Sequence, residues 1–499
     1  MNEKKNVVSK VLGILFSLIL VISSIYFLYQ LIQLNVLTSK LLFLATTIFI
    51  LIDLIFVLLL CFMSKGVVSK IICIILAIVL SLGTGIGGYY ISKTGGALNK
   101  ITSVTKNAKN TVSIIVKQSS DIKDKESLNG LSVGYLRNIG IAGSSAMLED
   151  LNKSNIKMEQ KQYDSMAALL EAFYNGEVDS IIINESSRSQ ILDMEAYSNF
   201  DSNTRVVYQT SYKVKNNDSA ASVSDITSKP FNVLISGSDT RGGFDENGRS
   251  DVIMVATVNP KSHTILLTSV PRDFYVTTAC DAGDGCMQGA LDKITHTGIH
   301  GTNTTKRTVE QLLGIEINYT FKVGFDTVTE LVDAVGGVDI TVAPGYALDR
   351  LTTDPSFGVH EGVNHLTGQQ ALAYARERYS YTEGDRQRTK NQQQVLMGIV
   401  DKITSPAIVT NYASIMDSMA NTFSTTMSND EITDLIKYQL NKNPKWKMEQ
   451  YMVDGTGDTL MCAELGDAAS VMVPDQSTVK MAKDKISAVL AGNSSDDVQ

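Results

Sequence analysis

The sequence predicts a membrane-anchored protein of mixed α/β (α+β) class. We expect an N-terminal three-helix membrane anchor, a small α/β accessory domain and a mixed-sheet domain flanked by helices. Three observations lead to this prediction. The first hundred residues contain three long apolar runs, the next hundred alternate strand and helix patterns, and from residue 231 three closely spaced strand patterns precede a series of helices. The 499 residues exceed one typical domain of about 150 residues, which agrees with several units.

The three apolar runs span residues 11–31, 41–63 and 71–90. Each is close to the ~20 residues that a helix needs to cross a bilayer. A cleaved signal peptide has a single, shorter apolar core, so we expect residues 1–92 to form a permanent anchor.

Lysines beside these runs predict the orientation of the chain. They lie mainly before the first run (Lys4, Lys5, Lys10) and between the second and third (Lys65, Lys70), whereas Lys40 alone separates the first from the second. Because positively charged loops stay on the cytoplasmic side, we expect a cytoplasmic N-terminus and, after three crossings, an extracellular remainder. Four lysines between residues 93 and 109 weaken this asymmetry.

A polar linker is expected over residues 93–110, followed by the accessory domain over 111–215 and a second linker, rich in Ser, Asp and Asn, over 216–229. Within the accessory domain, strand patterns (111–116, 131–136, 178–183, 206–213) alternate with helix patterns (144–151, 165–174). The layout resembles half of a solute-binding protein, but no motif identifies a ligand, so the role of this domain stays open.

Residues 230–490 are expected to form the main domain, with 491–499 as a flexible tail. Strands are predicted at 231–236, 251–258 and 264–270, and the turn at 259–262 makes the last two an antiparallel hairpin. If the first strand also runs opposite to the second, its end, the start of the second and the end of the third share one sheet edge.

That edge collects polar side chains: Asp239, Thr240, Arg241, Arg249, Asp251, Arg272 and Asp273. Two carboxylates with open positions suit Mg²⁺, which completes its octahedron with water and substrate phosphates. The alternative is that Asp239 is a turn residue and that Arg249 and Asp251 form a surface pair. Each residue alone fits that alternative, whereas the whole set at one edge favours a site.

The rest of the main domain shows further patterns, in chain order: helix 305–313, strand 321–325, helix 328–335, strand 338–342, a long connection over 343–366, helix 368–374, and tail helices at 431–440 and 479–490. His296 and His300 have helical ligand spacing, but Gly298 lies between them and the glutamate of HExxH is absent, so a packing or hydrogen-bonding role is favoured. Cys280 and Cys286 would close a small disulfide loop in an oxidising compartment, and a zinc site lacks further ligands nearby.

Positive charge is concentrated between residues 374 and 393 of a chain whose net charge is −8. The cations there are Arg376, Arg378, Arg386, Arg388 and Lys390. Planar guanidinium groups match phosphate oxygens in a bidentate way, so the segment suggests a phosphate site. The alternative is a solvated helix face, with Glu377, Glu383 and Asp385 paired to these arginines.

Local geometry favours the phosphate interpretation. Arg376 and Arg378 share one face if the chain is extended there. Gly384 and Asp385 then open a helix on which Arg388 and Gln392 lie one turn apart, and a helix N-terminus attracts anions. Together with the polar sheet edge, this arrangement predicts a diphosphate site.

Several separated motifs, in order, resemble the LytR-CpsA-Psr family. They are Asp239-Thr240-Arg241, Arg249-Ser250-Asp251, Val270-Pro271-Arg272-Asp273, Asp292-Lys293-Ile294-Thr295-His296, Val335-Gly336-Gly337-Val338-Asp339, Ala375-Arg376-Glu377-Arg378 and residues 384–392. The three apolar runs and the intervening α/β domain look most like the streptococcal-type capsule members of that family. The resemblance is weakest over residues 93–225, and Arg241 is its loosest match.

The resemblance implies an extracellular, membrane-anchored phosphotransferase. Such an enzyme moves a glycopolymer, most simply capsular polysaccharide and otherwise teichoic acid, from an undecaprenyl-diphosphate carrier to peptidoglycan. It also implies the site: Asp239 and Asp251 as ligands of Mg²⁺ (or Mn²⁺), with the diphosphate bound by Arg249, Arg272, Lys293, Arg376, Arg378, Asp385, Arg388 and Gln392. Asp239, Asp251, Arg272, Arg376 and Arg378 would be the catalytic set.

Two other functions remain open at this point. A hydrolase would act on the same lipid diphosphate with water as the acceptor. A membrane-bound regulator of transcription or capsule assembly would need either DNA or membrane proteins of capsule biosynthesis as partners. An acidic chain with its bulk outside cannot easily reach DNA, so no nucleic-acid partner is expected, whereas contact with capsule proteins through the membrane helices stays possible.

Overall fold

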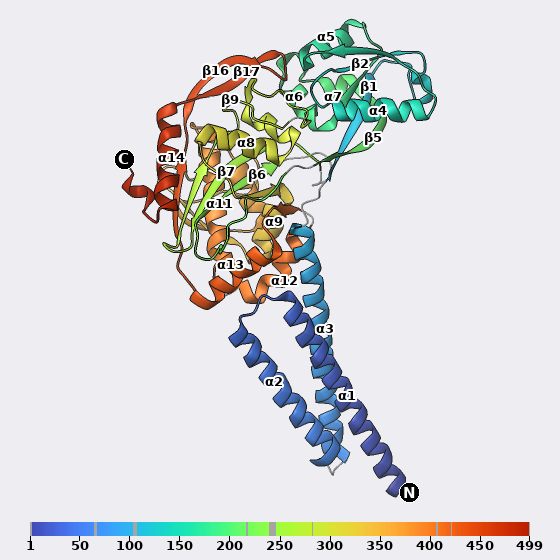
Figure 1. The fold of residues 1–499 in the computed structure, drawn as a ribbon, viewed down its shortest axis with the longest axis vertical. Coiled ribbons are helices and arrows are strands. Elements are labelled where there is room, and N and C mark those ends of the chain that lie inside the picture. Colours follow the sequence, from blue (N-terminus) through green and yellow to red (C-terminus); the bar gives the residue numbers. More distant parts are fainter. Residues whose placement is uncertain are drawn as a thin grey trace. The chain divides into compact units, whose positions relative to one another are not determined.

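The computed structural model describes residues 2–63, 67–102, 107–215, 218–238, 246–281, 283–405, 408–420 and 422–498 (Figure 1). The chain divides into two compact units. One unit comprises Met1–Lys100, Thr404–Ala420 and Ser428–Pro444, and the other comprises Ile101–Ile403, Asn421–Met427 and Lys445–Gln499.

The first unit is built on three long helices, α1 (Asn2–Leu34), α2 (Ser39–Leu58) and α3 (Val67–Thr102). Their apolar stretches over Lys10–Leu34, Ser39–Met63 and Val67–Thr102 are long and apolar enough to cross a membrane. The three predicted spans lie within them. Because α3 continues to Thr102, helix occupies much of the segment that the sequence suggests is a polar linker.

The same unit contains α12 (Ile408–Met419) and α13 (Asn429–Lys442). The Lys437 ammonium donates to the Asn35 side chain at 2.8 Å, next to the end of α1. The sequence placed these residues in the 230–490 domain, because an amphipathic pattern shows that a helix has a buried face but not what covers that face.

The second unit begins with the accessory domain, a five-stranded sheet in the order β3-β2-β4-β1-β5. Its strands are β1 (Asn107–Lys117), β2 (Ser132–Leu136), β3 (Glu159–Tyr163), β4 (Ser180–Asn184) and β5 (Thr204–Lys215). Its helices are α4 (Ile141–Lys153), α5 (Met166–Asn175), α6 (Arg188–Asp193) and α7 (Phe200–Asn203). β2 runs parallel to β3 and β4, as expected where helices connect strands. The sequence pattern missed β3 because that strand is polar and lies at the sheet edge.

The main domain is built on a six-stranded mixed sheet in the order β14-β11-β6-β7-β8-β15. The strands are β6 (Phe231–Ser238), β7 (Ser250–Asn259), β8 (Thr264–Ser269), β11 (Tyr319–Gly324), β14 (Phe423–Thr425) and β15 (Lys447–Met452). β6, β7 and β8 are antiparallel neighbours, which confirms the predicted hairpin and the predicted direction of the first strand. β11 and β15 join in parallel, so the sheet is mixed.

Helices cover the sheet. They are α8 (Thr302–Leu313), α9 (Phe325–Ala334), α10 (Gly368–Arg376), α11 (Asp385–Ile403) and α14 (Gln476–Leu490). On one face, Leu313 of α8 and Ile486 of α14 pack with Leu266 of β8 in one apolar core. On α11, the Gln393 amide donates to the hydroxyl of Ser269 at 2.9 Å, three residues after Leu266 on β8. Successive strand residues alternate in face, so α11 covers the opposite side of the sheet.

Three two-stranded hairpins complete the unit: β9 (Tyr275–Thr277) with β10 (Leu291–Lys293), β12 (Val338–Val342) with β13 (Gly362–Leu366), and β16 (Gly455–Cys462) with β17 (Asp467–Pro474). The long connection expected over 343–366 thus ends in a strand. Only the last five residues of that connection form β13, which is too short a run to give a clear sequence signal.

Candidate functional site

As predicted, the end of β6, the start of β7 and the end of β8 lie at one edge of the six-stranded sheet. Ser238 at the end of β6 lies opposite Ser250 at the start of β7, and β8 ends beside β7. At this edge, Nη1 of Arg272 donates to Oδ1 of Asp251 at 2.9 Å. The antiparallel register therefore brings together two charged groups that are far apart in sequence.

Arg272 lies among three carboxylates. Besides its bond to Asp251, its Nε is 3.7 Å from Oδ2 of Asp273 and 3.6 Å from Oδ2 of Asp385. Burial acts to lower the pKa of this guanidinium, but Asp251 and then Asp273 and Asp385 raise the pKa above its usual value. Arg272 is thus a fixed positive charge at the centre of the site.

Asp385, the first residue of α11, is the point where three arginines meet. Its Oδ1 accepts a hydrogen bond from Arg378 at 3.2 Å, its Oδ2 accepts one from Arg388 at 3.1 Å, and Arg272 is the third arginine. Burial acts to raise the pKa of this carboxyl, but Arg388 and Arg272 bring the pKa below its usual value. We call Arg272, Arg378 and Arg388 the arginine cluster.

Three carboxylates lie beside the arginine cluster, but two of its arginines keep hydrogen-bond donors that the described residues do not use. Burial lowers the pKa of Arg388, and repulsion from Arg272 lowers it further. Within the described part of the chain, the buried Nε atoms of Arg272 and Arg388 have no hydrogen-bond acceptor. Since buried donors are nearly always paired, these two N–H groups favour an anionic oxygen as the missing partner.

Two arginines of the cluster, Arg272 and Arg388, line a cavity of about 450 Å³, including its open mouth. Its polar wall includes Asp251, Arg272, Asp385, Arg388 and Gln392. The rest of its lining includes apolar residues from the sheet and its neighbours, such as Ile253 and Met452. A phosphate-sized group could therefore contact fixed positive charges beside an apolar surface.

Comparison with known proteins identifies the family. The model of the LytR-CpsA-Psr family matches residues 196–488, more than half of the chain. This chain belongs to the LytR-CpsA-Psr family. The resemblance in its sequence motifs is thereby confirmed.

Named relatives agree with this assignment. The "polyisoprenyl-teichoic acid–peptidoglycan teichoic acid transferase TagU" of Bacillus cereus is 33% identical over 245 residues, which cover 48% of this chain and 76% of TagU. The TagU protein of Enterococcus faecalis is 35% identical over 232 residues, 46% of this chain and 71% of that protein. Among solved structures, protein gbs0355 from Streptococcus agalactiae is 26% identical with a TM-score of 0.45, covering 53% of this chain and 88% of that chain.

Of two other residues suggested by the LytR-CpsA-Psr motifs, Lys293 lies at the margin of the arginine cluster and Arg249 pairs with another residue. The Lys293 ammonium is 3.4 Å from Oδ1 of Asp273, the same carboxylate that lies beside Arg272. Arg249 pairs instead with Asp193, the last residue of α6 in the accessory domain. The accessory domain therefore reaches a residue that the motifs assign to the site.

Arg376 differs from its predicted geometry. It is the last residue of α10, so extended chain begins only at Glu377. The Arg376 guanidinium lies over the ring of Phe325, 4.6 Å from the ring centroid, whereas Arg378 pairs with Asp385. The pattern at 368–374 had placed the helix end two residues too early, which is the usual error at helix boundaries.

Asp239, together with Thr240 and Arg241, lies outside the described residues. The predicted metal pair of Asp239 and Asp251 therefore stays a prediction. Among the residues that the structure describes, no group of three or more His, Cys, Asp or Glu side chains is placed to hold a metal ion.

Sequence reasoning missed the role of Glu377. This carboxylate is buried and accepts backbone N–H groups from Thr352, Thr353 and Ser380. Burial acts to raise the pKa of Glu377, but these backbone hydrogen bonds bring it below its usual value. Glu377 thus fixes the connection after β12 beside Arg378 rather than neutralising an arginine. A single acidic residue between two arginines gives no sequence signal for this role.

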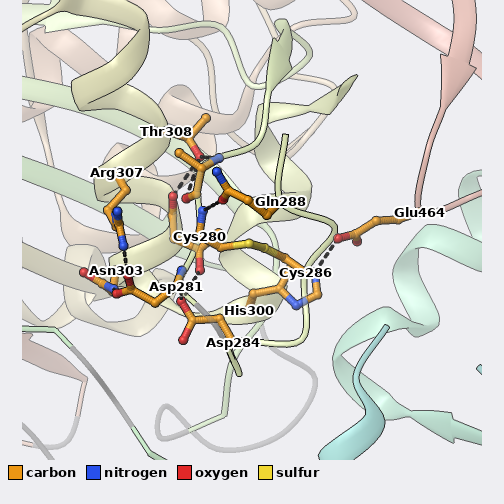
Figure 2. Close-up of a disulfide and its surroundings, with 12 residues drawn as sticks. Cys280, Asp281, Asp284, Cys286, Gln288, His300, Asn303, Arg307, Thr308 and Glu464 are labelled. Atoms are coloured by element: carbon orange, nitrogen blue, oxygen red, sulfur yellow. Dashed lines mark hydrogen bonds and ion pairs between the residues drawn. A yellow bond between two sulfur atoms is a disulfide. The ribbon is translucent and has the colours of Figure 1, made fainter. Parts of the chain in front are cut away.

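Both histidines of the 296–300 segment have carboxylate partners. Nδ1 of His296 lies 2.7 Å from Oδ1 of Asp292, and Nε2 of His300 lies 2.6 Å from Oε1 of Glu464. Cys280 and Cys286 form a disulfide beside His300 (Figure 2). The expected hydrogen-bonding role of the histidines is confirmed.

Proposed function

We propose that this protein is a membrane-anchored phosphotransferase that moves a glycopolymer from a polyprenyl-diphosphate carrier to peptidoglycan. The observation that carries the proposal is the arginine cluster, in which three arginines share one aspartate and two buried N–H groups have no acceptor among the described residues. Membership of the LytR-CpsA-Psr family and the names of the TagU relatives support the same reaction class.

In this proposal the arginine cluster binds the oxygens of the diphosphate, because guanidinium groups match phosphate in a bidentate way. Lys293 and Gln392 add donors at the margin, and Asp385 holds the three arginines in place. Phosphoryl transfer depends mainly on positioning and on neutralising developing charge, which fixed arginines supply.

The proposed reaction balances as follows. A hydroxyl oxygen of peptidoglycan forms a bond to the phosphorus that carries the sugar, and the bond from that phosphorus to the bridging oxygen breaks. Polyprenyl monophosphate leaves with the electron pair, and the hydroxyl proton passes to a base. The products are a phosphodiester-linked polymer and the carrier monophosphate.

A divalent cation is part of the proposal. Asp251 presents a carboxylate at the cavity, and oxygen donors of this kind suit Mg²⁺ or Mn²⁺, with Asp239 as the proposed second ligand. When bound, such an ion would neutralise diphosphate charge. The Asp251–Arg272 pair already places the carboxylate next to the arginine cluster.

The proposed location follows from the three apolar helices and the lysine distribution. We propose a multi-pass protein of the cell membrane with a cytoplasmic N-terminus and an extracellular main domain. The motif resemblance to streptococcal-type capsule members favours capsular polysaccharide as the polymer, and contact with capsule-biosynthesis membrane proteins would fit that role. The TagU relatives are named for teichoic acid.

The test is reconstitution of the full chain in lipid nanodiscs with Mg²⁺, peptidoglycan and either of two donors, a capsular or a teichoic-acid polymer on polyprenyl diphosphate. We expect polymer linked to peptidoglycan, release of polyprenyl monophosphate, and loss of both in the Arg272→Ala variant. Release of monophosphate with the polymer transferred to water alone would favour the hydrolase and overturn the transferase proposal.

A further inference from the structure

The accessory domain is docked on the main domain through the edge where α/β sheets usually bind ligands. Ligands of such sheets lie beyond the carboxyl ends of the parallel strands. In this protein, backbone of the main domain lies there. The N–H of Gly140, which follows β2, donates to the carbonyl of Gly285 at 3.1 Å, and the N–H of Ala167 in the first turn of α5 donates to the carbonyl of Leu465 at 2.8 Å.

The segment between β16 and β17, residues 463–466, accepts two backbone hydrogen bonds from the start of α5, and we call it the ribbon tip. Leu465 is 3% exposed and belongs to the same apolar core as Leu169 and Phe173 of α5. Beside it, Glu464 pairs with His300, next to the disulfide of Cys280 and Cys286 (Figure 2). Hydrogen bonds and apolar packing thus fix the accessory domain to the ribbon tip, and the buried pair of Glu464 with His300 fixes the ribbon tip within the main domain.

Docking places α6 next to the candidate site. The first residue of α6, Arg188, is held by Glu185 and by Asp201, and Ile191 in its middle is fully buried. The last residue, Asp193, pairs with Nη1 of Arg249. The Arg249 side chain is only 16% exposed, whereas Asp193 is 51% exposed. A carboxylate on a fixed helix therefore holds a mostly buried arginine.

Arg249 lies two residues before Asp251, whose carboxylate lines the cavity. The residue between them, Ser250, is buried, and its hydroxyl bonds to those of Ser236 and Thr305. Asp251 is the residue that pairs with Arg272.

We propose that Asp193 is a positioning residue, through which the accessory domain holds the Arg249 guanidinium in place for the diphosphate. This inference rests on the proposed function and on the LytR-CpsA-Psr motifs, which assign Arg249 to the diphosphate. A long arginine side chain that is already fixed loses less conformational freedom on binding, so the Asp193 contact strengthens binding without touching the ligand. The accessory domain then completes the diphosphate site instead of binding a solute of its own.

The experiment measures binding of farnesyl diphosphate, a short polyprenyl diphosphate, to the full chain in nanodiscs with Mg²⁺, by calorimetry. Asp193→Asn should weaken binding about tenfold, by analogy with supporting partners of metal ligands, and Asp193→Glu should restore part of it. Glu195→Gln is the matched control: it removes one carboxylate two residues away that has no ion pair within the described residues, and it should leave binding unchanged.

A double-mutant cycle separates positioning from a general structural role. In an Arg249→Ala background, Asp193→Asn should have no further effect, since its partner is gone. The inference would be overturned if Asp193→Asn weakened farnesyl diphosphate binding equally in the Arg249→Ala and wild-type backgrounds. It would also be overturned if Asp193→Asn alone bound as tightly as wild type or more tightly. Either result would leave the proposed function intact. Failure of the wild-type protein to bind farnesyl diphosphate would overturn both.

Discussion

At the scale of single residues, the candidate site is defined by arginines that meet at one carboxylate. Asp385 is shared by three arginines, and burial together with repulsion from Arg272 lowers the pKa of Arg388. A protein that keeps such a residue gives up stability for a group that is useful only when an anion binds.

Arg388→Gln should therefore separate stability from activity. We expect the melting temperature of the ligand-free protein to stay the same or rise, because repulsion from Arg272 is removed. The transfer rate should fall roughly 100-fold, the usual loss when one hydrogen-bond donor to the charge of the transition state is deleted. Differential scanning fluorimetry and the transfer assay check the two halves. Lys402→Gln, on the same helix but paired with Asp339, is the control and should leave transfer unchanged. A large drop in the melting temperature of Arg388→Gln would contradict the electrostatic argument.

The buried pair of His300 with Glu464 makes the stability of the protein depend on pH. Complete burial acts to lower the pKa of His300, but Glu464 and then Asp284 raise it above its usual value near 6.5. A group whose pKa is raised on folding stabilises the protein below its unfolded pKa, and that stabilisation is lost as pH rises through the folded value. The pair of His300 with Glu464 should therefore be strongest on the acidic side of this range.

His300→Gln should lower the melting temperature most near pH 6, and the difference from wild type should shrink as pH rises above 6.5 toward 9. Comparing the variant with wild type at each pH cancels the titration of other groups. His365→Gln is the control, since the pair of His365 with Asp339 is solvent-exposed and should contribute little at any pH. A destabilisation by His300→Gln that is constant from pH 6 to 9 would contradict the assignment.

At the scale of elements, the β16–β17 ribbon links the two domains of the second unit (Figure 1). Its strands are largely exposed along their length, and the ribbon tip is buried. The ribbon therefore connects the two domains mainly through the buried residues of its tip. Loosening the tip should free the accessory domain while leaving the six-stranded sheet folded.

Leu465→Ala tests the ribbon tip. Truncation of a buried leucine costs about 2–5 kcal/mol, and here the loss falls on domain docking because Leu465 packs in the core around Leu169 and Phe173. Hydrogen–deuterium exchange should show faster exchange of the Ala167 amide, which bonds to the Leu465 carbonyl, with little change in β7. Met461→Ala, at an exposed position of the same ribbon, should leave exchange unchanged. If amide exchange in β7 became faster by the same factor as at Ala167, the core of the main domain, and not domain docking, would have been weakened.

At the scale of the whole molecule, three apolar helices precede a large polar part, and surface leucines and isoleucines cover those helices. Exposed apolar side chains at this density are stable only where lipid is the solvent. The distribution of lysines then decides which side the polar part occupies.

The proposed topology predicts a protection pattern in cells whose wall has been removed. External protease should degrade the part after residue 102, whereas a tag at the N-terminus and a cysteine-specific label site introduced at Lys65 should stay protected until the membrane is permeabilised. Labelling at a cysteine replacing Lys40 should need no permeabilisation. Labelling from outside at position 65 but not at position 40 would reverse the orientation.

The sequence alone determined the elements with strong local patterns and the residue types that carry the chemistry. Apolar runs define the three membrane helices, the periodicity from 231 to 270 defines three antiparallel strands, and the spacing of Arg388 and Gln392 on one helix places both at a single cavity. These features depend on neighbours close in sequence, or on a turn whose geometry is local, so pattern and propensity suffice. Boundaries were less certain, as Arg376 and β13 show.

Only the tertiary structure decided which charges meet. Asp385 pairs with the arginine cluster while Glu377, eight positions earlier in the same stretch, binds backbone N–H groups; Asp193 reaches Arg249 from another domain, and α13 groups with the membrane helices. Ion pairs and helix packing depend on distances between segments far apart in the chain. Because a carboxylate or an apolar helix face accepts many partners equally well, the folded arrangement of the backbone has to select one.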